Sequence, residues 1–306
     1  MKSYNGVNYG TILFLGNSTT IQMFGCVIIT EHKTVVIDGG TVGDAPQLEQ
    51  FLRTHRPPAS AWTEDDPIHV DLWLFTHPHH DHFGAFLTLC ENTTALTVEQ
   101  ICCHFPSNED LRRYEGRNEA EIRLWDLFDA LAAKRFAARV HTNEVGDVFK
   151  ADDITAEVLR VYNPAFTANF VNNSSTVYKI TGEHASVLIL GDLGVEGGEE
   201  LMRMYPEEIT VTKEDGTQEK RHPRAVLFTD YTQMAHHGQR GVSRACYESL
   251  SPRACLWAAP DWLWDNNNGG GFDCGPWETV RTREWMDALG VTTHLVEKDG
   301  TQSFEI

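Results

Sequence analysis

Four histidines and one aspartate lie within the six positions 77–82 of the segment THPHHDHFGA, which covers residues 76–85. Each buried imidazole needs a hydrogen-bond partner, and neighbouring imidazolium groups repel one another, so this crowding has a free-energy cost. A bound metal ion would offset the cost, because imidazole nitrogens and carboxylate oxygens are common ligands of divalent metals. The segment therefore predicts a metal site.

The spacing of these residues favours two neighbouring ions. In an extended segment His77 and His79 project from the same side and can bind one ion. A turn at Asp81 and His82 then offers an oxygen and a nitrogen to a second ion. His80 points away from its neighbours in this arrangement, so we expect it to support the site from outside.

The metal-binding segment follows an apolar run, IHVDLWLF at residues 68–75, which predicts a strand covered on both faces. In layered α/β proteins, functional groups commonly lie at the C-terminal ends of such strands. Helical periodicity predicts helices at about 45–55, within 107–139 and at about 197–205, with Asn118 and Glu121 as a capping box. We expect a strand at 225–228, a loop or hairpin at 213–224, and a C-terminal hairpin that turns at Lys298, Asp299 and Gly300.

Strands and helices form two similar α/β halves, roughly residues 1–144 and 145–306, without a linker between them. We therefore expect one domain over residues 1–306, in which two stacked sheets lie between helices. Seven cysteines without a CxxC pair predict a reduced, cytoplasmic chain. The sequence shows no apolar run that approaches about 18 residues, so neither a membrane span nor a membrane partner is expected.

The net charge of −19 makes the protein strongly acidic. Such a surface repels phosphate backbones, so broad binding to nucleic acids is not expected. Two bound divalent ions would nevertheless add positive charge inside a cleft, which leaves a small phosphorylated substrate possible. The sequence contains no signal for the oligomeric state.

The segment THPHHDHFGA resembles the signature of the metallo-β-lactamase-fold hydrolases. VLILGDL at 187–193 and DYTQMAHHGQRGVS at 230–243 extend this resemblance over nearly the whole chain. NNSS at 172–175 and the closing DGTQSFEI are similar to one branch, the hydrolase domain of bacterial DNA-uptake competence proteins (ComEC-type) and its free-standing relatives. The resemblance implies a four-layer αββα sandwich of two mixed β-sheets flanked by helices.

The resemblance also implies the remaining metal ligands. Asp192 follows aliphatic residues and a glycine, so its carboxylate emerges at a strand end, where bridging two cations would offset the cost of burying it. One of His236 and His237 should complete the second site. We expect His236 to be the ligand and His237 to contact the substrate or donate a proton. The complete predicted set of metal ligands is His77, His79, Asp81, His82, Asp192 and His236.

One departure from the family pattern concerns the first ion. Many members of the fold carry another histidine about twenty residues before the bridging aspartate, where this sequence has Asn172. Asparagine is a weak, neutral oxygen donor, so the first site should be looser and more exchangeable. Asn172 and Asn173 are therefore candidates for contact with the first ion or the substrate.

These features predict a hydrolase in which two divalent ions share a bridging hydroxide, with Asp81 orienting this nucleophile and His237 as general acid. Zinc is the expected metal, and oxygen-rich ligation makes manganese the alternative. The branch resemblance favours a phosphodiester or a related small-molecule ester as substrate. Lactones, thioesters and β-lactams stay open because the same hydroxide attacks acyl centres. A non-catalytic metal-binding protein that kept the fold is a further alternative, favoured by Asn172.

The segment WAAPDWLWDNNNGGGFDCGPW at 257–277 holds four tryptophans and a run of Asn and Gly. We expect a lid over the metals, with Trp262 or Trp264 against the substrate, Asn266 and Asn267 beside them, and residues 269–271 as the hinge. The alternative is a loop whose tryptophans only cover the core.

Overall fold

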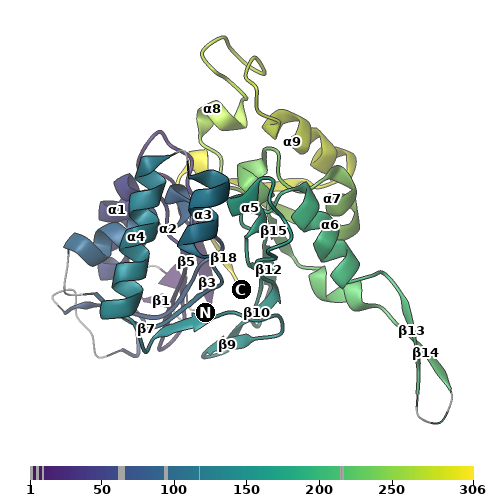
Figure 1. The fold of residues 1–306 in the computed structure, drawn as a ribbon, viewed down its shortest axis with the longest axis horizontal. Helices are drawn as coiled ribbons and strands as arrows, with labels where there is room; N and C mark the ends of the chain where they lie inside the picture. Colours follow the sequence, from purple (N-terminus) through teal and green to yellow (C-terminus); the bar gives the residue numbers. More distant parts are fainter. Residues whose placement is uncertain are drawn as a thin grey trace.

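Two seven-stranded mixed sheets stack against each other, and helices cover their outer faces (Figure 1). This arrangement comes from a computed structural model that describes residues 3–4, 7–8, 10–60, 66–92, 96–116, 118–213, 215 and 217–306. The four-layer sandwich predicted from the sequence is confirmed. Among the described helices, none combines the length and the apolar character needed to cross a bilayer.

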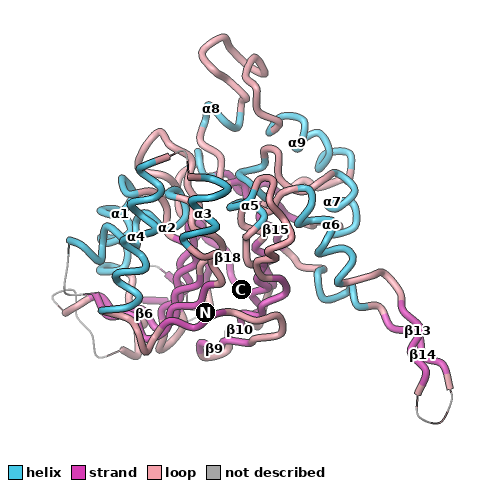
Figure 2. Tube along the Cα trace, viewed as in Figure 1, coloured by secondary structure: helices cyan, strands magenta, loops and turns pink. Residues whose placement is uncertain are grey.

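The first sheet contains strands from the N-terminal half and one from the C-terminus. Its spatial order is β18 (Gln302–Glu305), β3 (Thr11–Phe14), β4 (Gly25–Ile29), β5 (Thr34–Asp38), β6 (Ile68–Leu74), β7 (Leu96–Cys103) and β8 (Val140–Thr142). Strands β5 to β8 are parallel, whereas β18, β3, β4 and β5 pair antiparallel. The covering helices are α1 (Ala45–Thr54), α2 (His80–Asn92), α3 (Asn108–Glu115) and α4 (Glu119–Lys134) (Figures 1 and 2).

The second sheet is formed by the C-terminal half. Its order is β17 (Thr293–Val296), β16 (Ala254–Trp257), β15 (Tyr231–Gln233), β12 (Ser186–Ile189), β11 (Val177–Thr181), β10 (Ile154–Arg160) and β9 (Val148–Ala151). Strands β12, β15, β16 and β17 are parallel. The helices of this half are α5 (Phe170–Asn173), α6 (Val195–Met204), α7 (Arg244–Leu250), α8 (Asp261–Trp264) and α9 (Thr279–Ala288).

Two small pairs of strands complete the fold. β1 (Ser3–Tyr4) pairs with β2 (Val7–Asn8), and β13 (Ile209–Thr212) pairs with β14 (Gln218–Arg221). The second pair projects from the body of the molecule as a narrow arm (Figure 1). Short 3-10 helices are η1 (Val42–Asp44), η2 (Pro223–Leu227), η3 (Ala235–Gly238) and η4 (Glu297–Asp299).

Successive side chains of a strand point to opposite faces of the sheet, and both faces of the first sheet are covered. In β5, Val35 and Ile37 point toward the second sheet, whereas Val36 packs with the helices. The layer between the sheets takes buried side chains from both, including Ile37 of β5 and Ile180 of β11. Burial on both faces gives β5 the continuous β-branched sequence TVVI. This packing on both faces holds the C-terminal ends of β5 and β6, from which the site residues follow.

Three local expectations were wrong. The C-terminal hairpin does not form, because β17 pairs with β16 in the second sheet, whereas β18 crosses to the first sheet and pairs with β3. Residues 225–228 belong mainly to the 3-10 helix η2, which starts at Pro223. Asn118 does cap α4, through the Ala120 amide, but Glu121 turns away from this end.

Asp71 supplies a pH-dependent tie between β5 and β6. Its carboxylate accepts hydrogen bonds from the Thr34 amide and Lys33 Nζ, each at 2.9 Å. Burial alone would raise the pKa of Asp71, but hydrogen bonds from His69, Thr34 and Lys33 outweigh burial and lower the pKa from 3.8 to about 2. A lowered folded-state pKa stabilises the protein above the unfolded-state value, and this contribution disappears as the pH falls through both values.

Asp71→Asn should therefore reduce the free energy of unfolding by about 1 kcal/mol at neutral pH. The deficit should shrink as the pH falls below about 5, because wild-type Asp71 loses its charge-dependent contribution there. Chemical unfolding of both proteins between about pH 3 and 7 measures this difference. A deficit that stays constant over this range would contradict the assignment.

Candidate metal centre

The histidine segment bridges the end of β6 and the start of α2. The sequence analysis placed a turn at Asp81 and His82; in the structure the extended backbone stops at His79, whose carbonyl accepts the amides of His82 and Phe83 as α2 begins. Asp81 and His82 therefore lie in the first helical turn. Position 84 requires glycine because α2 lies against the backbone at residues 41–42. A Cβ added to Gly84 would come within 2.8 Å of the main-chain nitrogen of Val42.

His80 lies beside the cluster and contacts α4. Its Nδ1 is 2.6 Å from Glu121 Oε1, and its side chain is 44% exposed. This hydrogen bond raises the pKa of His80. Trp125, on the same helix, donates its indole N–H to the Pro78 carbonyl at 2.7 Å. α4 thus holds the metal-binding segment from behind, which explains why Glu121 is buried and not part of a helix cap.

The first group of possible ligand atoms surrounds Asp192, which follows β12. His77 Nε2 is 3.7 Å from Asp192 Oδ2, and His82 Nε2 is 3.1 Å from Asp192 Oδ1. One ligand atom from each of His77, His82 and Asp192 lies within 4.8 Å of the others, and all three residues are buried. His79 Nδ1 faces His77 Nε2 at 3.0 Å, as expected if both imidazoles bind one ion.

The second group contains His237, at the end of β15. Asp81, His82 and His237 offer ligand atoms within 4.8 Å of one another. His237 Nε2 lies 3.1 Å from Asp81 Oδ2 and 3.4 Å from Asp192 Oδ2. Its Nδ1 is 2.8 Å from the Ala258 carbonyl, which orients the ring.

His236 occupies the margin of this cluster. Its side chain is 19% exposed, and its Nε2 is 4.0 Å from Asp192 Oδ2. Both His236 and His237 have left-handed backbone angles, with φ of 52° and 57°. This conformation turns the two adjacent rings to different sides. The geometry favours His237 over His236 as the ligand, the reverse of the assignment made from sequence.

Asp38, at the end of β5, is a functional candidate that the sequence analysis missed. Its Oδ2 lies 2.7 Å from His82 Nδ1, and its carboxylate also accepts the amide and the hydroxyl of Thr76. Such a carboxylate fixes the tautomer and orientation of a metal-binding imidazole. The sequence TVVIDGG does show an acidic residue at the end of a buried strand. Its partner His82 is 44 residues away in the chain, so the sequence alone does not reveal the contact.

Asp38→Asn should weaken metal binding by about 10- to 100-fold, because it removes the charged partner of His82 while the side-chain shape remains. Titration of the metal-free protein with zinc, followed against a chelating dye, measures this change. Asp44→Asn is the matched control, since Asp44 is equally buried but accepts from Ser18 and Thr41. Equal zinc affinities for wild type and Asp38→Asn would contradict this role.

Charges in the centre are strongly coupled. Burial alone would raise the pKa of Asp81 and Asp192, but neighbouring histidines hold both well below the usual range of a carboxyl group. Burial alone would lower the pKa of His82, yet Asp192 and Asp38 raise it to about 10. The carboxylates likewise raise the pKa of His237. The buried carboxylates therefore require nearby positive charge, which protons or divalent ions can supply.

Unpaired buried atoms test whether these residues suit metal ions. His82 Nε2, His237 Nε2 and Asp192 Oδ1 are buried and have no hydrogen-bond partner of suitable geometry. The other ring nitrogens of His82 and His237 face Asp38 and the Ala258 carbonyl. A neutral imidazole that donates through Nδ1 presents a lone pair at Nε2. The donor set therefore fits divalent metal ions.

The two asparagines of NNSS differ in their surroundings. Asn172 is 6% exposed, and its Oδ1 is buried without a partner. In contrast, Asn173 Oδ1 accepts the amides of Gly194 and Gly197, and its Nδ2 donates to Ala168 and Glu196. Asn173 thus holds the start of α6 and has no free side-chain group for a ligand, so the expected substrate contact does not hold for Asn173.

The tryptophan loop is largely packed against itself. Trp264 lies edge-on to Trp257, with ring centroids 5.4 Å apart, and under the Arg283 guanidinium at 4.2 Å. Asn266 is buried and binds Asp273 and the Trp277 amide, whereas Asn267 accepts the amides of Gly269 and Gly271. Trp262 differs, because its indole N–H reaches across to the Thr20 carbonyl at 2.7 Å.

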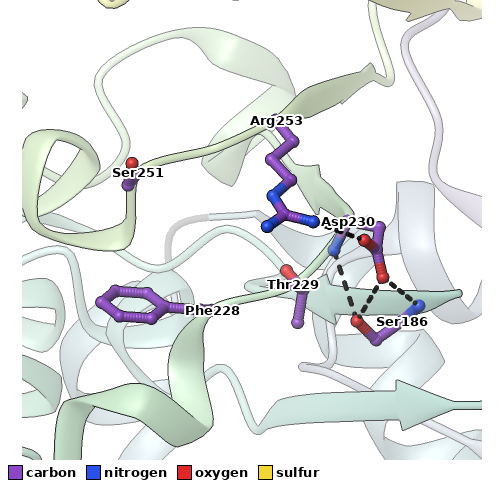
Figure 3. A pocket seen from close by; sticks show the side chains of 6 residues that line it. All are labelled: Ser186, Phe228, Thr229, Asp230, Ser251 and Arg253. Carbon is purple, nitrogen blue, oxygen red and sulfur yellow. Dashed lines mark hydrogen bonds and ion pairs between the residues drawn. The ribbon is translucent and has the colours of Figure 1, made fainter.

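A hollow of about 360 Å³ lies at the opposite, N-terminal edge of the parallel strands (Figure 3). Asp230 there accepts hydrogen bonds from the amide and the hydroxyl of Ser186, and it forms an ion pair with Arg253. The polar groups at its centre thus satisfy one another. This hollow contains none of the predicted ligands.

Comparisons with known proteins agree with this architecture. The family model described as the metallo-beta-lactamase superfamily matches residues 25–228, more than half of the chain. Among curated proteins, none matches the sequence significantly.

Solved structures are similar to this chain at low sequence identity. The metallo-beta-lactamase fold protein YhfI from Bacillus subtilis is 9% identical, with a TM-score of 0.50, and the match covers 96% of this chain and 99% of YhfI. CmlA β-hydroxylase, in a mutant form, is 11% identical with a TM-score of 0.49; the match covers 97% of this chain but only 54% of that protein. A metallo-beta-lactamase from Cronobacter sakazakii is 14% identical with a TM-score of 0.40, over 67% of this chain and 77% of the enzyme.

Proposed function

Since the chain belongs to the metallo-β-lactamase superfamily, we propose that it is a hydrolase that uses two divalent metal ions. One observation carries this proposal: buried nitrogen and oxygen atoms of His82, His237 and Asp192 that have no hydrogen bond of suitable geometry converge where parallel strands of both sheets end. A protein that had lost metal binding would have little reason to retain such costly atoms.

Each ligand has a definite place in the proposed centre. His77 and His79 would hold one ion through imidazole nitrogens that already face each other at 3.0 Å. Asp81, His82 and His237 would hold the other ion, and Asp192 would lie between the two ions. Asn172 Oδ1, a buried oxygen without a partner, is the candidate for a further weak contact at the first ion. Zinc is the proposed metal and manganese the alternative.

Bound ions would lower the pKa of a water molecule, so that it can attack near neutral pH, and would stabilise negative charge on the substrate. The protein residues would orient the nucleophile, position the ligands and contact the substrate. Asp81 would orient the nucleophile through a carboxylate oxygen, while Asp38 and the Ala258 carbonyl keep His82 and His237 in position. His236, 19% exposed at the margin of the cluster, would face the substrate and donate a hydrogen bond or a proton to it.

The proposed substrate is a small phosphodiester or a related small-molecule ester. The resemblance of NNSS and DGTQSFEI to the ComEC-type branch supports phosphodiester chemistry over acyl chemistry. The net charge of −19 supports a small substrate over a long nucleic acid, because a long phosphate backbone would meet repulsion outside the centre.

Hydrolysis assays on zinc- and manganese-loaded protein test this proposal. Bis(p-nitrophenyl) phosphate, an acyl-homoserine lactone and nitrocefin represent the three substrate classes. Turnover of the phosphodiester that disappears with chelator and exceeds turnover of the other two is the expected result. Preference for the lactone or nitrocefin would replace the phosphodiester assignment, and no turnover of any ester by fully loaded protein would contradict the hydrolase.

Trp262 is the part of the predicted lid that remains a candidate for substrate contact. It lies four positions after Ala258, whose carbonyl orients His237, and its hydrogen bond to Thr20 joins the loops of the two halves. The proposed role is a wall of the substrate channel, held in position by this hydrogen bond and by packing on Trp277, with ring centroids 4.6 Å apart.

Trp262→Phe should raise KM about 3- to 10-fold without changing metal content, because it removes one hydrogen bond but keeps the aromatic ring. Steady-state kinetics on the best substrate measures this effect. Trp264→Phe is the matched control, because Trp264 packs against Trp257 and Arg283 and should leave KM unchanged. Equal KM values in both variants would contradict the proposed contact between Trp262 and the substrate.

A further inference from the structure

A second cavity, of about 310 Å³, lies behind the metal-binding segment, between α3, α4 and the end of β7. Its walls are apolar and are formed by Pro78, Phe83, Phe105, Leu111, Trp125 and Phe128. Phe83 and Leu111 are almost completely buried, so the core and not a mobile surface defines this space. The volume lies at the lower end of the range for small-molecule sites and suits an aromatic ring with a short side chain.

The aromatic walls are held in fixed orientations. Trp125 donates its indole N–H to Pro78, so its ring presents apolar surface to the cavity. The rings of Phe105 and Phe128 have centroids 5.0 Å apart, and those of Phe83 and Phe105 are 6.0 Å apart and nearly perpendicular. Aromatic side chains in this arrangement offer both faces and edges to a further ring.

The mouth of the cavity is polar and carries an unbalanced negative charge. Among its polar residues, Asp129 has no hydrogen bond or ion pair within the described part of the chain. Arg112, the nearby cation, is paired with Asp126 on the preceding turn of α4. Burial and the Asp126 carboxylate raise the pKa of Asp129, and a cation at the mouth would stabilise the charged form of Asp129.

We propose that this cavity binds a small aromatic amine, with its ring between Phe83, Trp125 and Phe128 and its ammonium group at Asp129. The apolar walls would take the ring out of water, and the unpaired carboxylate would select positive charge. An aromatic acid would be repelled by Asp129. The site is separate from the metal centre, since the segment lines it with Pro78 and Phe83 and with none of the proposed ligands.

Isothermal titration at pH 7 with three probes of similar shape tests this site: 2-phenylethylamine, 2-phenylethanol and phenylacetate. The amine should bind with one site per chain, the alcohol about tenfold more weakly, and phenylacetate not measurably. Asp129→Asn should weaken amine binding about tenfold and leave alcohol binding unchanged. Thr142→Trp, at an exposed strand position on the mouth, should block both ligands.

Controls separate this site from general charge effects and from the metal centre. Asp153→Asn removes an exposed carboxylate in the turn between β9 and β10 and should leave amine binding unchanged. Chelator treatment should also leave it unchanged. Equal binding of the amine and the alcohol, no saturable amine binding, or loss of amine binding on metal removal would each overturn the proposal.

Discussion

Asp192→Asn is expected to abolish the dinuclear centre and to reduce kcat/KM by about 10³-fold or more. Asp192 lies within 3.7 Å of ring nitrogens of His77, His82 and His237, so one carboxylate faces both ligand groups. The amide of asparagine keeps the shape but removes the negative charge, and its N–H2 would point at nitrogens that must present lone pairs to metal. Metal content by plasma mass spectrometry, together with steady-state kinetics, measures both effects.

Asp230→Asn is the matched control for this substitution. Asp230 lies at the opposite end of the same parallel strands, where it accepts hydrogen bonds from Ser186 and pairs with Arg253. The control should lose some stability but keep its metal and its activity. Retention of full metal content and activity by Asp192→Asn would contradict the role of Asp192 as a metal ligand.

His237→Asn is expected to lose one ion per chain and to reduce kcat/KM by about 10²- to 10³-fold, whereas His236→Asn should keep both ions. His237 is completely buried and its Nε2 faces Asp81 and Asp192, but His236 is partly exposed and more distant. Asparagine suits both positions because it tolerates the left-handed backbone angles found there. The two variants therefore carry similar backbone costs, and their difference reports on the side chains.

The kinetics of His236→Asn test the second half of this assignment. A residue that contacts the substrate should lower kcat or raise KM while the metal content stays at the wild-type value. Loss of metal from His236→Asn, with retention in His237→Asn, would restore the assignment made from sequence. That result would also mean that the turn after β15 rearranges when metal binds.

The sequence predicted those features that depend on short-range patterns. The apolar run of β6 followed by His77, His79, Asp81 and His82 located the site at a strand end, and the fold followed from the resemblance carried by these residues. Long-range pairing was less accessible: β18 joins β3 across almost the whole chain, and no local pattern at residues 302–305 specifies that partner.

The missed details of the site have physical reasons. His236 and His237 are adjacent and chemically identical, and their left-handed backbone angles decide which ring faces Asp192. Asp38 acts through His82, a contact that exists only after β5 and β6 pair. Trp262 and Trp264 occur in one aromatic loop and both pack against the core, but only Trp262 also donates its indole N–H across to Thr20, a contact that no local pattern predicts.

The number of metal ions per chain is the most direct measurement of the central claim. The protein would be stripped with chelator, reloaded with zinc or manganese, dialysed and analysed by plasma mass spectrometry at known protein concentration. The proposed centre requires about two ions per chain, with the first site exchanging faster because Asn172 replaces a histidine. No retained ion with either metal would contradict the dinuclear centre and with it the proposed hydrolase.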